Sequence, residues 1–128
     1  MRTSAPKLLA IIELGGYPNF VPLYQRLGLE VELVSSQRRA QSSLRSRIPD
    51  LVVAEFNYQS DFRDRTSNLE SLMARLQKHP ETKVILFYQP EHADKLSRLL
   101  NRFSIFASLS YPIEAIQFEQ VLRSALES

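Results

Sequence analysis

Five short apolar runs, each followed by a segment with helical spacing, constrain the fold of this 128-residue chain more than any other feature. The runs are rich in β-branched and aromatic residues, and four of them are near-continuous rather than alternating. Near-continuous runs of this length are typical of strands that are covered on both faces in a parallel sheet. The chain is therefore expected to form a parallel sheet from five strands, at residues 8–12, 31–34, 51–54, 84–87 and 105–109.

The segments between these runs have apolar residues at helical spacing, within residues 20–27, 37–48, 69–76, 96–103 and 113–126. Gly28 is expected to end the first helix, and Ser67 with Glu70 forms a capping box before the third. The helix within 37–48 has the fewest apolar positions and is expected to be short. Because a β-α unit repeats five times with short connections, the sequence predicts an α/β fold, a three-layer doubly wound sheet in a single domain of residues 1–128.

Composition argues against several classes of function. The chain has no cysteine, which removes disulfides, thiolate zinc sites and cysteine nucleophiles and favours a reducing compartment. Two histidines are a poor supply for a metal site or a catalytic histidine. The longest apolar run, residues 8–12, is far shorter than the ~18 residues of a membrane span, and no signal-peptide cleavage site follows it. We therefore expect no metal, no cofactor, no enzymatic activity, no membrane contact and a cytoplasmic location.

The charge distribution gives little indication of a nucleic-acid partner. Sixteen basic and 14 acidic residues leave a net charge of +2, which is too balanced to indicate nucleic acid by itself. Arg38, Arg39, Arg45 and Arg47 lie in a stretch without acidic residues, but no aromatic residue is interleaved among them for base stacking. This stretch is interpreted as the solvated face of a helix.

Chemistry in a doubly wound sheet is expected at the carboxyl ends of the strands. Aromatic residues gather at these positions: Tyr17, Phe56, Tyr58, Phe62, Tyr88 and Tyr111. They either hold a flat ligand such as a quinone or a nucleotide base, or plug the site by contacting one another. The plug is favoured, because nothing else in the sequence indicates a ligand.

Three segments of the chain resemble the receiver domains of bacterial two-component response regulators, such as the chemotaxis receiver. Residues 49–56 (PDLVVAEF) look like the strand-three signature of that family, residues 79–85 (HPETKVI) lead into strand four, and residues 108–113 (SLSYPI) match the end of strand five. The resemblance covers essentially the whole chain. It implies a flavodoxin-like topology with strand order 2-1-3-4-5 and a role in phosphorelay signal transduction through protein contact.

The resemblance also implies a phosphoryl pocket, from which this chain departs at every position. The family has a carboxylate pair for Mg²⁺ after strand one, a phosphoryl-accepting Asp after strand three, a hydroxyl residue after strand four and a Lys after strand five. The corresponding residues are Glu13 and Leu14, Glu55, Tyr88 and Tyr111. Leu14 supplies no ligand oxygen, Glu55 is one methylene longer than Asp, and Tyr111 has no positive charge. We therefore expect a degenerate pocket, in a pseudo-receiver that is not phosphorylated at the usual position.

Two features of this degenerate pocket have alternative interpretations. Glu55 either mimics a phosphorylated Asp and locks an active-like state, or is a remnant carboxylate that is solvated at the strand end. The family couples a small hydroxyl residue after strand four to an aromatic residue in strand five. In this chain the first position holds the large Tyr88 and the second holds the small Ser108. Tyr88 either fills the space that the strand-five aromatic would enter, or both positions drifted once the chemistry was lost.

The resemblance places a partner surface on helix four, strand five and helix five. The polar side chains expected on helix four are Asp94, Lys95, Arg98 and Arg102, opposite an apolar stripe that includes Leu100. The partner is expected to be a kinase, an output protein or a second copy, because 128 residues leave no room for an effector domain unless the chain was cut from a longer protein. The alternative function is a small-molecule sensor that binds a quinone-like or nucleotide-like ligand among the aromatic residues.

Overall fold

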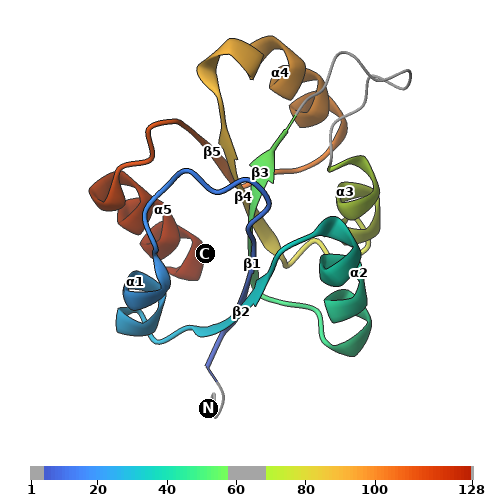
Figure 1. The fold of residues 1–128 in the computed structure, drawn as a ribbon. Coiled ribbons are helices and arrows are strands. Elements are labelled where there is room, and N and C mark those ends of the chain that lie inside the picture. The colour runs from blue at the N-terminus through green and yellow to red at the C-terminus, as the bar shows by residue number, and fades with distance from the viewer. Residues whose placement is uncertain (1–4, 58–68, 128) are drawn as a thin grey trace.

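The structure is a computed structural model that describes residues 5–57 and 69–127. Five parallel strands form one sheet in the order β2-β1-β3-β4-β5, with helices on both faces (Figure 1). The strands are β1 (Lys7–Ile11), β2 (Glu30–Val34), β3 (Leu51–Phe56), β4 (Lys83–Tyr88) and β5 (Ala107–Ser110). The helices are α1 (Val21–Arg26), α2 (Gln37–Ser46), α3 (Glu70–Leu76), the 3₁₀ helix η1 (Pro90–His92), α4 (Ala93–Arg102) and α5 (Ala115–Glu127). The predicted α/β fold and strand order are confirmed.

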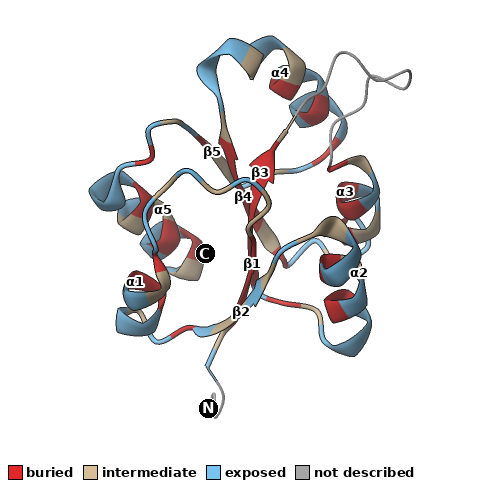
Figure 2. Ribbon diagram, viewed as in Figure 1, coloured by how far each residue is buried: buried red, intermediate tan, exposed pale blue. Residues whose placement is uncertain are grey.

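Each face of the sheet has its own apolar core. α2, α3 and α4 cover one face, and α1 and α5 cover the other (Figure 1). Successive residues of β3 alternate between the cores, so that Val52 and Ala54 face α2, α3 and α4 whereas Val53 faces α1 and α5. All residues of β1 and β3 are buried (Figure 2). Burial on both faces explains why these runs are almost uninterrupted in apolar residues.

The first helix ends where the sequence predicts. Leu27 is the C-terminal cap of α1, and Gly28 follows it with φ +79°, in the left-handed region that glycine adopts without strain. Among the helices of the described residues, none is long and apolar enough to cross a membrane.

Two expectations about element boundaries are wrong. α2 is not short, because it spans ten residues and its N-terminus is capped by Ser36 Oγ, which accepts a hydrogen bond from Arg39 N at 3.1 Å. β5 begins at Ala107 rather than at residue 105, and the chain before it joins β4 through a hydrogen bond from Phe106 N to Val84 O. Ser67 of the expected capping box lies outside the described residues.

The buried stripe of α4 is narrower than expected. Leu96, Leu99 and Phe103 are buried, whereas Leu100 is 40% exposed. A residue that follows Leu99 directly lies about 100° farther round the helix, which carries Leu100 beyond the core. An apolar side chain is therefore present on the outer surface of α4.

Candidate functional site

Glu55 lies within β3, not at its solvated end. It is 1% exposed, and its neighbour in β4 is the buried Phe87. The interpretation of Glu55 as a remnant solvated carboxylate is therefore wrong. A buried carboxylate is stable only when hydrogen-bond donors or a cation replace the water that it has lost.

Four donors from the loop between β1 and α1 surround the Glu55 carboxylate. Glu13 N and Gly15 N donate to Oε2 at 3.0 and 3.2 Å, and Leu14 N donates to Oε1 at 2.8 Å. The Tyr17 hydroxyl also donates to Oε2, at 2.9 Å. Consecutive backbone N–H groups of this kind form a concave binding site for an anion. Here the anion is a side chain of the same protein.

The loop can follow this path because of its two glycines. Gly15 and Gly16 have φ values of +74° and +86°, which side-chain-bearing residues rarely adopt. This backbone turn brings the N–H groups of residues 13–15 over the end of β3 and carries Tyr17 back onto Glu55. The chain therefore turns tightly after β1, and the N–H groups of this turn bind the Glu55 carboxylate.

The side chains of the loop do not form a cation site with Glu55. Glu13 Oε1 accepts a hydrogen bond from Gln37 Nε2 at 3.1 Å, so its carboxylate is engaged by α2. Leu14 is 79% exposed and carries no ligand oxygen. Within the described residues, no group of three or more His, Cys, Asp or Glu is arranged to hold a metal. Because N–H and O–H donors face Glu55, the residues present do not fit the Mg²⁺ that receiver chemistry requires.

An aromatic cluster closes the space beside the Glu55 carboxylate. The ring of Tyr17 is stacked with Phe20 and with Tyr111, at centroid distances of 6.1 Å in both pairs, and meets Phe87 edge-on at 4.9 Å. Phe87 in turn contacts Phe118 of α5 edge-on at 5.1 Å. The cluster therefore links the loop after β1 to β4 and α5, as the plug interpretation requires.

The membership of this cluster differs from the sequence expectation. Tyr17 and Tyr111 meet, but Tyr88 and Phe56 lie on the opposite face of the sheet, with the core under α3 and α4. The cluster contains Phe20 and Phe87 instead, which the sequence predicts only as part of a helix and of a strand. The alternation of side chains along β4 could have indicated this membership, because Phe87 and Tyr88 must point to opposite faces of the sheet. Tyr58 and Phe62 lie outside the described residues.

Burial and the neighbouring carboxylate make the clustered phenols harder to ionise. Burial, followed by the negative charge of Glu55 and the hydrogen bond to it, raises the pKa of the Tyr17 phenol far above its ordinary value. Burial, with a smaller contribution from the charge of Glu55, raises the pKa of Tyr111 to about 12. Both phenols are therefore neutral around Glu55 near pH 7.

The two expected switch residues share one face of the sheet. In the pairing of β4 with β5, Leu86 is opposite Ser108, and Tyr88 is opposite Ser110. Residues 86 and 88 point to the same face, so Tyr88 and Ser108 are diagonal neighbours on the side of α3 and α4. Both side chains are half-buried.

The expected partner residues lie on the outer side of α4. Asp94 and Arg98 are exposed, whereas Lys95 is half-buried. Arg102 forms an ion pair with Glu70 of α3 and lies 5.0 Å from the centroid of the Phe103 ring. With the exposed Leu100, this surface combines charged and apolar side chains.

We expect Glu55→Gln to lower the free energy of unfolding by about 2–3 kcal/mol, because an amide NH₂ would face an N–H or O–H donor in either orientation. Chemical denaturation of both proteins measures the difference. Glu91→Gln, at an exposed glutamate of η1, is the matched control and should change stability by less than about 0.5 kcal/mol. A similarly small loss for Glu55→Gln would contradict the role assigned to this carboxylate.

We expect alkaline unfolding to be coupled to the clustered phenols. A phenol whose pKa is raised on folding stabilises the fold fully below its unfolded pKa of about 10, and that stabilisation is lost as pH rises through the folded value, about 12 for Tyr111. Phenolate absorbance and circular dichroism, recorded together, measure ionisation and unfolding. Difference spectra against Tyr17→Phe and Tyr111→Phe assign the signals. Ionisation of either phenol near pH 10 in a folded protein would refute the expectation.

Solved structures with a similar fold include receiver domains of signalling proteins. A receiver domain from Clostridium thermocellum superimposes with a TM-score of 0.71 and 19% identity, covering 95% of this chain and 94% of that chain. The signal receiver domain of an HD-domain-containing protein from Pseudomonas fluorescens Pf-5 has a TM-score of 0.69 and 22% identity, with coverage of 96% and 95%.

NtrX from Brucella abortus, solved in complex with ADP, has a TM-score of 0.75 and 19% identity over 96% of this chain. This chain spans only 27% of NtrX. No protein-family model and no curated protein sequence matches the chain. The strand order, the length of the aligned region and these superpositions show that the chain has the fold of response regulator receiver domains.

Proposed function

We propose that this protein is a pseudo-receiver, a signalling module that acts by protein contact and does not accept a phosphoryl group at the position of the family's Asp. The observation that carries the proposal is the closed environment of Glu55. Both of its carboxylate oxygens accept hydrogen bonds from the protein's own loop, and the side chain is buried.

Phosphoryl transfer to a carboxylate needs an accessible oxygen and a cation that neutralises the transferred group. The oxygens of Glu55 are not accessible, because the N–H groups of residues 13–15 donate to them, and these donors are not cation ligands. Tyr111, at the position of the family's Lys, carries no positive charge and contacts Tyr17 instead. The chemistry of the pocket therefore opposes a phosphorylation cycle.

We infer that Glu55 holds the pocket in one state. In a pocket that is switched by phosphorylation, the charge at this position changes, whereas here one permanent carboxylate anchors the loop through four hydrogen bonds. This inference agrees in one respect with the interpretation that Glu55 mimics a phosphorylated Asp, because in both cases the pocket stays in a single conformation. It differs in mechanism, since the carboxylate binds backbone donors rather than reproducing a phosphoryl group.

The alternative of a small-molecule sensor is not favoured by the ring geometry. The centroids of Tyr17 and Tyr111 are 6.1 Å apart, which is less than the roughly 7 Å that two rings need to enclose a flat ligand between them. A flat ligand that inserts between Tyr17 and Tyr111 would first have to separate two rings that both contact Phe87.

Incubation with acetyl phosphate and Mg²⁺ tests the absence of phosphorylation directly. We expect the intact mass to stay unchanged, because backbone N–H groups cover the Glu55 oxygens and the described residues form no cluster of metal ligands beside them. A receiver domain with an intact acceptor Asp, treated in the same tube, shows that the donor is active. A phosphoryl adduct on Glu55 or on any Asp would contradict the proposal.

Affinity capture from the source cell tests the surface of α4. We expect Arg98→Glu to reduce recovery of a specific partner at least about fivefold, because the substitution reverses an exposed charge on this surface. Lys78→Glu, at an exposed lysine just after α3, makes the same charge change away from α4 and should leave recovery unchanged. Equal recovery of the partner with the unchanged protein and both variants would contradict the assignment of α4 as the partner surface.

A further inference from the structure

The outer edge of β2 offers backbone hydrogen-bonding groups that β1 does not use. Glu30 N donates to Pro6 O and Ile12 N donates to Val34 O, both at 2.8 Å, so residues 30, 32 and 34 face β1. In a parallel pair the intervening residues point their N–H and C=O groups the other way, which directs those of Val31, Leu33 and Ser35 outward. Within the described part of the chain, β2 has β1 as its only neighbouring strand.

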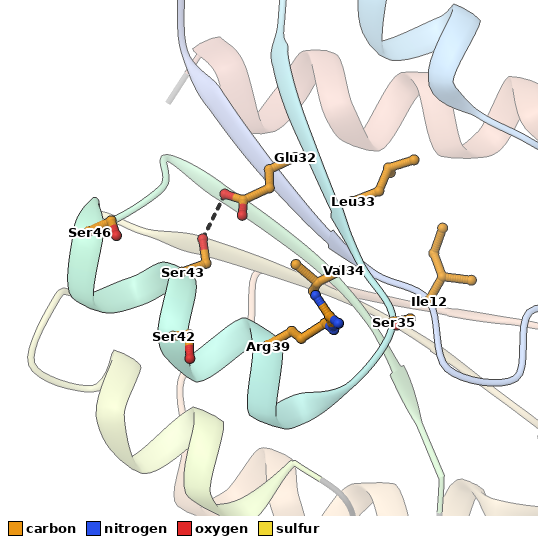
Figure 3. A pocket seen from close by; sticks show the side chains of 9 residues that line it. All are labelled: Ile12, Glu32, Leu33, Val34, Ser35, Arg39, Ser42, Ser43 and Ser46. Atoms are coloured by element: carbon orange, nitrogen blue, oxygen red, sulfur yellow. Dashed lines mark hydrogen bonds between the residues drawn. The ribbon is translucent and has the colours of Figure 1, made fainter.

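Hollows flank this edge on both faces of the sheet. Between β2 and α2 lies an open hollow of about 670 Å³, lined in part by Val34, Arg39 and Ser42 (Figure 3). Between β2 and α1 lies a second hollow of about 280 Å³, lined in part by Tyr17 and Tyr24. Leu33 and Ile12 line both hollows, and Leu33 is 51% exposed.

A strand added beside β2 would reach both hollows at once. Its backbone would pair with the outward groups of β2, and its successive side chains would point alternately to the two faces of the sheet. Leu33 points away from α2, whereas Glu32 and Val34 lie on the side of α2 (Figure 3). Alternate side chains of the added strand would therefore enter two hollows that are lined by different kinds of residue.

The hollow on the side of α2 is lined by one carboxylate, Glu32, and one guanidinium, Arg39. Glu32 is already engaged, since it forms an ion pair with Lys7 at 2.8 Å and accepts a hydrogen bond from Ser43 Oγ at 2.7 Å. Arg39 reaches over the hollow, and no described carboxylate forms an ion pair with it. No acidic residue occurs between residues 33 and 49 of the sequence. The hollow on the side of α1, by contrast, is lined mainly by apolar and aromatic side chains.

We propose that β2 accepts an extended peptide segment of a partner protein as a sixth strand, with acidic side chains toward α2 and apolar side chains toward α1. The proposal concerns the edge of the sheet opposite β5 and does not rest on the surface of α4. Backbone pairing supplies affinity, and the alternation of acidic and apolar side chains supplies specificity.

A second copy of this chain is a less suitable occupant. When two copies pair antiparallel through β2, their α2 helices lie on the same face of the continuous sheet. Each α2 carries Arg38, Arg39 and Arg45 without an acidic residue, so the two helices repel each other. An acidic peptide meets the same surface with the opposite charge.

A display library of random linear peptides, selected against the whole 128-residue protein, tests this proposal. We expect enrichment of peptides in which Asp or Glu alternates with apolar residues, and amide shifts on binding that centre on β2 and α2. A selected peptide, labelled for fluorescence anisotropy, then reports affinity for the variants. Failure to enrich any peptide, enrichment without acidic residues, or shifts that centre on α4 would overturn the proposal.

Three variants of the protein separate backbone pairing from charge. Leu33→Pro removes an outward N–H that β1 does not use and should weaken the peptide at least about tenfold. Arg39→Glu should weaken it at least about fivefold, and an acid in the first turn of α2 favours the helix, so folding is not at risk. Arg38→Glu is the matched control, since Arg38 is exposed but does not line the hollow.

The control should change affinity by less than about twofold. If Arg38→Glu and Arg39→Glu weakened peptide binding equally, the effect would come from the overall charge of the protein. That result would overturn the assigned docking geometry. Sedimentation of the free protein adds one further outcome. A dimer that Leu33→Pro abolishes would show that a second copy, not a peptide, occupies this edge.

Discussion

The hydrogen bonds between the Glu55 carboxylate and the loop after β1 determine the structure of the carboxyl edge of the sheet. A carboxylate that is 1% exposed must be satisfied internally, and the N–H groups of residues 13–15 do so. The same path of the loop places Tyr17 on Glu55 and against Tyr111. The Glu55 carboxylate therefore links the loop after β1 to β3 and helps to position Tyr17 within the aromatic cluster.

The groups around Glu55 are also of the opposite kind to those that a phosphorylation pocket requires. A Mg²⁺ site needs oxygen ligands that converge on one point, whereas here donors converge on a carboxylate. Glu55 has one methylene more than Asp, and its carboxylate meets the loop donors at 2.8–3.2 Å. The backbone N–H of Leu14, the carboxylate of Glu55 and the ring of Tyr111 therefore all take part in one connected arrangement.

Much of the fold could be predicted from the sequence, because apolar runs and helical stripes depend on side-chain identity. The environment of Glu55 could not, since three of its four donors are backbone N–H groups that every non-proline residue carries. The count of apolar positions also leaves out the Ser36 cap, which satisfies a backbone donor where α2 begins. Membership of the aromatic cluster depends on which face of β4 each ring occupies, which alternation predicts once the strand is located.

The proposed single state of the pocket directs attention to the outer surfaces of the protein. The strand order places β2 at one edge of the sheet and β5 at the other, so the proposed peptide edge and the α4 surface lie on opposite sides of the molecule (Figure 1). Occupation of one surface therefore leaves the other accessible. If both proposed surfaces bind, the module could hold two partners together without any change in its pocket, because each surface uses its own backbone groups and charges.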